Sequence, residues 1–111
     1  MHNPRWTEEE MILAANLAYK RQWRGVNSRT PGISELSELL RSAKFHADEA
    51  KDDRFRSTSS VSMKVNNLIA GHPQRTGGGL RSTSAEKLVV QKFIDDPNKM
   101  MAEAARIRKQ I

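Results

Sequence analysis

The sequence predicts an all-α fold: a compact bundle of about five helices that includes a variant helix-turn-helix. Two observations carry this prediction. Apolar residues recur at helical spacing in five separate segments, and Ser, Thr or Asp residues of the kind that cap helices stand at the start of each segment. We expect the whole chain, 1–111, to form a single helical domain, because its length supports one modest core but no separate catalytic module.

The first predicted helix begins after Thr7. Thr7 and Glu10 have the spacing of a capping box, and further carboxylates stand at the positive end of the helix dipole. Most residues from Met11 to Tyr19 are apolar, and only a narrow polar strip is left, formed by Glu9, Asn16 and Lys20. A helix this apolar is expected at the centre of the bundle.

The second predicted helix covers SELSELLRS, residues 34–42. Its expected cap is Ser34, and the side chains expected to face inward are Leu36, Leu39 and Leu40. Residues 44–54 are polar, mixed in charge and without a clear period. We expect them to form a surface loop or a frayed helical extension.

Three more helices complete the prediction. The third lies within FRSTSSVSMKVNNLIAG, residues 55–71, and its cap is expected at Thr58, Ser59 or Ser60. After a glycine-rich loop, residues 82–84 begin the fourth; valines within it are compatible with a short strand, but period and length favour a helix. The fifth begins with Asp96 as cap and Pro97 in the first helical position.

The charge of the chain is uneven. Its net charge is +6 and its sequence pI is about 10.1, which favours polyanionic partners. Up to Asp53 the chain is near neutrality, with eight Lys or Arg and nine Asp or Glu residues. From Arg54 to Ala85 there are five basic residues and no acidic one. The third predicted helix lies inside this acid-free window.

The third predicted helix has two faces of different chemistry. The apolar face is expected in the core and comprises Val61, Val65 and Leu68. The opposite face carries hydroxyl, thioether, ammonium and amide groups, from Ser60, Met63, Lys64 and Asn67. Such groups can pair with base edges or phosphates in a DNA groove. The helix start, with Arg54 and Arg56 directly before it, suits a phosphate.

The second and third helices have the order of a helix-turn-helix, in which the third would be the recognition helix. Their connection, residues 42–57, is much longer than the usual turn of about three to four residues, so the pair would be a variant with an insertion. A plainer alternative stays open. The helix would then be capped by serine for stability alone, its polar face would be solvated, and Met63 would pack under the insertion.

Five segments carry a family resemblance: PRWTEEEMILAANLAY, ISELSELLRS, FRSTSSVSMKVNNL, TGGGL and DDP. In this order the chain resembles, over almost its whole length, the N-terminal helical head domain of modification-dependent (type IV, McrA-like) HNH restriction endonucleases. The resemblance implies a role in DNA engagement, with matching positions at Arg56, Ser60, Met63, Lys64 and Asn67. RWTEEE together with Trp23 also resembles, more weakly, the helical Myb/SANT repeats that bind DNA.

In such enzymes the head domain precedes modules that recognise modified DNA and a C-terminal HNH nuclease. This sequence ends at Ile111, before a nuclease could begin. We therefore expect either a domain cut from a larger enzyme or a free-standing relative that kept binding and lost the chemistry.

No catalytic residue, cofactor or metal site is expected. The chain lacks cysteine, and His2, His46 and His72 are scattered through a terminus and two loops. TGGGL lacks the Gly-Lys-Ser/Thr ending of a phosphate-binding loop; a flexible turn is the expected reading, and a DNA phosphate clamp aided by Arg75 and Arg81 is the alternative.

The sequence thus predicts a non-catalytic module that binds double-stranded DNA, alone or with the remaining modules of an HNH nuclease. The alternative is a protein-interaction or regulatory module that acts on a nuclease or another DNA-processing partner. No apolar run approaches the roughly 18 residues of a membrane span, so we expect a cytoplasmic protein, on the nucleoid when bound. The candidate DNA-contacting residues are Arg54, Arg56, Ser57, Ser59, Ser60, Met63, Lys64, Asn67, Arg75 and Arg81.

Overall fold

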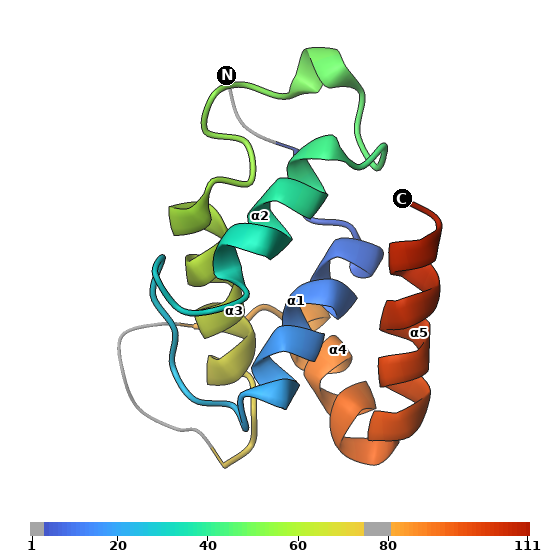
Figure 1. Ribbon diagram of the computed structural model, residues 1–111. Coiled ribbons are helices and arrows are strands. Elements are labelled where there is room, and N and C mark those ends of the chain that lie inside the picture. The colour runs from blue at the N-terminus through green and yellow to red at the C-terminus, as the bar shows by residue number, and fades with distance from the viewer. Residues whose placement is uncertain (1–3, 75–80) are drawn as a thin grey trace.

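The computed structural model describes residues 4–74 and 81–111. Within these ranges it contains five α-helices, one short 3-10 helix and no strand, which confirms the predicted all-α fold (Figure 1). The helices are α1 (Glu8–Lys20), α2 (Ile33–Ser42), η1 (Asp48–Ala50), α3 (Thr58–Ala70), α4 (Ser84–Asp95) and α5 (Pro97–Lys109).

Helix α1 is the centre of the bundle, as its apolar sequence predicts. It packs against all four other α-helices, with α3 and α5 on opposite sides of it (Figure 1). One prediction about α1 is wrong: Asn16, expected in a solvated polar strip, is only 4% exposed. Glu9 and Lys20 are exposed as expected, but neighbouring helices cover the strip at Asn16, whose Oδ1 finds no hydrogen-bond partner in the described part of the chain.

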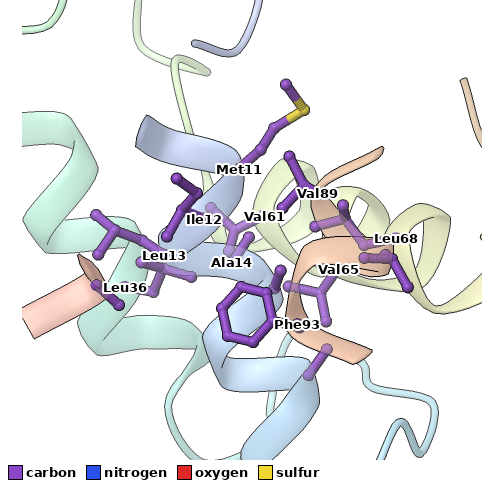
Figure 2. Close-up of a cluster of buried hydrophobic side chains, with 14 of the residues drawn as sticks. Met11, Ile12, Leu13, Ala14, Leu36, Val61, Val65, Leu68, Val89 and Phe93 are labelled. Carbon is purple, nitrogen blue, oxygen red and sulfur yellow. The ribbon is translucent and has the colours of Figure 1, made fainter. Parts of the chain in front are cut away.

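The core gathers side chains from all five helices. Figure 2 shows Val61 and Val65 of α3 converging with Ala14 of α1 and Phe93 of α4. The predicted apolar face of α3 is confirmed, because Val61, Val65 and Leu68 are all fully buried. Burying one such side chain contributes about 1.5–3 kcal/mol. These contacts fix the rotation of α3 about its own axis and so determine which residues it turns outward.

The helix starts follow the predicted caps with two exceptions. The Thr7–Glu10 capping box is present, and Asp96 accepts a hydrogen bond from the Lys99 N–H. Helix α3 is capped by Ser57, one residue before the predicted choices, because the Ser57 hydroxyl oxygen accepts from the Ser60 N–H (3.2 Å). Helix α4 is capped by Thr83, within the predicted range.

Helix α2 begins earlier than predicted, at Ile33 after Gly32. The Gly32 carbonyl already accepts from the Leu36 N–H (3.0 Å), so Ser34 lies in the first turn and does not cap. Gly32 has φ +97°, and a Cβ there would lie 2.7 Å from Cδ1 of Leu17. Only glycine meets both conditions without strain.

The connection 43–57 folds back onto α2. Lys51 Nζ donates to the carbonyls of Arg41 (3.0 Å) and Ala43 (2.9 Å) and so satisfies the C-terminal end of that helix. Arg41 Nη1 in turn donates to the Phe55 carbonyl (2.8 Å), and Phe55 is buried. The segment is a loop, as predicted, with one short 3-10 helix. Lys51 in its middle and Phe55 near its end both hydrogen-bond to the C-terminal part of α2.

Candidate nucleic-acid interface

The outward face of α3 is polar and accessible at its centre. Met63 is 60% exposed, which rules out the alternative that it packs under the insertion. Ser59 is exposed, Ser60 and Asn67 are half-buried, and none of these three side chains forms a hydrogen bond within the described ranges. The first turn of α3 contains no acidic residue. This face can therefore donate and accept hydrogen bonds to a partner.

Arg56 does not belong to this face, and the prediction that it contacts DNA is corrected. It is 1% exposed, and it donates to Glu10 through Nε (2.8 Å to Oε2) and Nη2 (3.0 Å to Oε1). Nη2 also donates to the Pro4 carbonyl (3.0 Å), and the guanidinium lies 4.6 Å from the ring centroids of Trp6 and Phe55. Reaching a phosphate would leave a buried carboxylate unpaired, which is strongly unfavourable.

Glu10 is the centre of this buried cluster. Besides Arg56, its carboxylate meets the His46 ring (Nε2 to Oε1, 2.8 Å) and accepts from the Thr7 N–H (2.9 Å). Burial acts to raise the pKa of Glu10, but the hydrogen bonds from Arg56, Thr7 and His46, with the charge of Arg56, outweigh it. The net pKa lies below its usual value, so Glu10 is charged at neutral pH. The cluster fastens the N-terminal segment and the start of α3 to α1.

Lys64 also forms an ion pair within the protein. Its Nζ lies 2.6 Å from Oε2 of Glu86, which is 1% exposed. Glu86 is the capping-box residue of α4 and also accepts from the Thr83 N–H (2.7 Å). Lys64 therefore links α3 to α4. The acid-free window of the sequence suggests that only basic residues lie here, but in the fold the carboxylate of Glu86 neutralises Lys64.

The other predicted residues lie around the two ends of α3. The Ser57 hydroxyl accepts the capping hydrogen bond of α3. Arg54 is exposed and follows the acidic residues Asp52 and Asp53 in the chain. Arg81 is exposed near the C-terminal end of α3. Its neighbour Ser82 packs so closely against Gly71 that a Cβ on Gly71 would lie 2.5 Å from the Ser82 hydroxyl. Arg75 and the TGGGL segment lie outside the described residues.

The structure brings one basic segment to α3 that sequence reasoning missed, the loop 21–32 between α1 and α2. The Asn66 side chain accepts from the Val26 N–H (2.9 Å) and donates to the Val26 carbonyl (2.8 Å). A signal was present, because residues 11–34 contain four basic residues and no acidic one: Lys20, Arg21, Arg24 and Arg29. The sequence alone does not show that this second acid-free window lies close to α3.

Comparison of the chain with models of protein families, with curated proteins and with solved structures found no match. In the described ranges, no helix has both the length and the apolar character needed to cross a membrane. Across the same residues, no three His, Asp or Glu side chains form a group that could hold a metal ion. The geometry of the α3 surface is thus the main basis for a functional proposal.

Proposed function

We propose that this protein is a DNA-binding helical module that engages duplex DNA mainly through phosphates, with α3 as the recognition helix. The observation that carries the proposal is the outward face of α3. This face carries exposed Met63 and unbonded Ser60 and Asn67, on a helix that a basic loop contacts through Asn66, in a chain of net charge +6. Phosphate contacts position such a module, and side chains on the helix read base edges.

The residues on and just before α3 have different roles in this proposal. Asn67 and Ser60 offer hydrogen bonds to base edges, where one well-formed bidentate pair is worth about 1–3 kcal/mol of discrimination. Met63 supplies an apolar contact beside them. Lys64 and Arg56 orient the helix from inside the fold, through Glu86 and Glu10, and do not bind phosphate.

The sequence motifs extend the proposal to a family. Their order resembles the head domain of modification-dependent HNH restriction endonucleases, and three of the five matching positions are Ser60, Met63 and Asn67 on the outward face of α3. We propose that the module is a domain or a relative of such an enzyme and has no catalytic activity of its own. Its duplex preference would then depend on modification of the bases or of the backbone.

Titration of a labelled duplex, followed by fluorescence anisotropy at several salt concentrations, tests this function. Affinity should fall with salt, with a log–log slope of about 0.9 per phosphate neutralised. Unmodified, methylated and phosphorothioated duplexes form the parallel arms. Ser60→Ala and Asn67→Ala should change the preference among duplexes more than the salt slope. Absence of binding at about 50 mM salt would refute the proposal.

A protein-interaction role is the second candidate, and one observation favours it. Met63 on α3 and Leu88 on α4 are 60% and 56% exposed, and these two helices pack together. Exposed apolar side chains suit a protein contact. The test is calorimetric titration with purified HNH nuclease modules. Loss of that binding in Met63→Ser and Leu88→Ser, with DNA affinity unchanged, would assign these two side chains to a protein partner.

A further inference from the structure

We propose that the loop 21–32 is the second wall of the DNA interface, and that Arg24 and Arg29 in it bind the phosphates that hold α3 against a duplex. The inference rests on the proposed DNA-binding function and assigns its phosphate contacts. It also makes Asn66 a positioning residue, which holds the loop in place without touching DNA.

Two contacts fix the loop along α3. Asn66 pairs with both backbone groups of Val26, so one side chain satisfies a donor and an acceptor at once. The Trp23 ring lies between Tyr19 and His72, with ring centroids 6.3 and 4.9 Å away. His72 follows the end of α3, so the loop is fastened to the C-terminal half of that helix and just beyond it, and Figure 1 shows the chain passing beside α3.

The backbone at the end of α1 directs the loop there. Gln22 and Trp23 have φ of 59° and 60°, in the left-handed region that side-chain-bearing residues rarely adopt. The Trp23 N–H donates to Ala18 (2.8 Å) and the Gln22 N–H to Tyr19 (2.9 Å), a helix ending that usually places glycine where Gln22 stands. Strain of this kind persists only where the surroundings over-determine it. Here the Trp23 and Val26 contacts do so.

The loop carries exposed cations that are not neutralised by a carboxylate in the described ranges, whereas the cation of α3, Lys64, is neutralised. Arg24 and Arg29 are exposed, and each lies within three residues of Val26. No carboxylate in the described ranges pairs with either guanidinium. By contrast, Arg56 is neutralised by Glu10 and Lys64 by Glu86. A guanidinium donates two parallel hydrogen bonds to phosphate oxygens, so these two arginines suit a duplex backbone.

The bonds within the loop hold this arrangement. Arg24 Nε donates to the Arg21 carbonyl (3.2 Å), which leaves its terminal nitrogens free to turn outward. Around Arg29, the Asn27 N–H donates to Thr30 Oγ1 (2.9 Å) and the Arg29 N–H donates to Asn27 Oδ1 (2.8 Å). The loop is therefore an ordered element at the edge of α3, and the binding surface extends from the helix onto it.

The test compares salt slopes of duplex binding. The double variant Arg24→Ala/Arg29→Ala should lower the slope by about 1.8, which is about 0.9 per lost phosphate contact, and weaken binding equally on all sequences. Asn66→Ala keeps every charge but releases Val26, and should lower the slope as well. The matched control is Arg108→Ala/Lys109→Ala, two exposed cations on α5, across the bundle from α3. Circular dichroism melting shows that each variant is folded.

The outcomes separate the two proposals. A wild-type slope that falls in the loop variant but not in the α5 control supports the inference. If the wild-type protein binds DNA but the two double variants have equal salt slopes, the inference is overturned and the DNA-binding function stands. A wild-type protein that does not bind overturns both. If Asn66→Ala alone retains the full slope, its role as a positioning residue is refuted.

Discussion

Replacing Arg56 with alanine should destabilise the fold severely. The substitution removes two charged hydrogen bonds to Glu10 and one to the Pro4 carbonyl, and leaves a buried carboxylate with only His46 and Thr7 as partners. Removing one member of a buried ion pair costs about 3–5 kcal/mol. A domain of this size has about 5–15 kcal/mol of stability in total, so the loss is a large share of it.

The assay is urea unfolding followed by circular dichroism, with free energies of unfolding taken from linear extrapolation. The matched control is Arg54→Ala, two residues away and exposed, which should change stability by less than about 0.5 kcal/mol. The double variant Glu10→Gln/Arg56→Met should be more stable than Arg56→Ala, because glutamine keeps the capping box and no buried charge is left unpaired. A loss below about 1 kcal/mol for Arg56→Ala would refute the buried ion pair.

Three further predictions follow from the same contacts. The pKa of Glu10 is lower in the folded protein than in the unfolded chain, so its contribution to stability is present at neutral pH and is lost as pH falls through the folded pKa. The difference in free energy of unfolding between wild type and Glu10→Gln should therefore become smaller in acid. A difference that stays constant from pH 7 to acid would contradict this. Gly32→Ala should cost about 1–3 kcal/mol of unfolding free energy, because of the positive φ and the contact with Leu17, whereas Gly25→Ala meets no side chain closer than 3.8 Å and should cost far less. Lys64→Met should lower the free energy of unfolding by about 1–3 kcal/mol, because it strands a buried carboxylate, yet leave the salt slope of DNA binding within error of wild type; a lower slope would mean that Lys64 contacts phosphate after all.

Features that depend on neighbours in the sequence were predictable. The Thr7–Glu10 capping box spans one helical turn, and the Asp96 cap precedes a proline at the first helical position. The apolar face of α3 follows from spacing within one helix, so its burial was expected. The position of Met63 was left open between two alternatives, and its 60% exposure decides for the outward one. For these elements the local pattern and the tertiary structure agree.

Features that depend on distant partners were not predictable. Arg56 meets Glu10 across 46 positions, Val26 meets Asn66 across 40, and Lys64 meets Glu86 across 22. A charge pattern along the chain does not show which carboxylate the fold places beside each cation. The sequence therefore shows the basic window around α3, but two of its cations, Arg56 and Lys64, are paired with buried carboxylates in the fold.

These pairings also change which residues define the candidate interface. Among the predicted residues, Ser59, Ser60, Met63 and Asn67 remain on the outward face of α3, and their contact with DNA stays a prediction. The loop 21–32, which contacts α3 through Asn66, also carries exposed cations, and sequence reasoning assigned this segment no role. The proposed interface therefore depends on where the fold places the loop 21–32 as well as on α3 itself.

The most direct test of the central claim is the salt slope of duplex binding for the wild-type protein beside the Arg24→Ala/Arg29→Ala variant. The account predicts a steep slope for the wild type and a slope smaller by about 1.8 for the variant, with the Arg108→Ala/Lys109→Ala control unchanged. No binding by the wild type at about 50 mM salt, or a slope that the loop variant shares with the control, would contradict it.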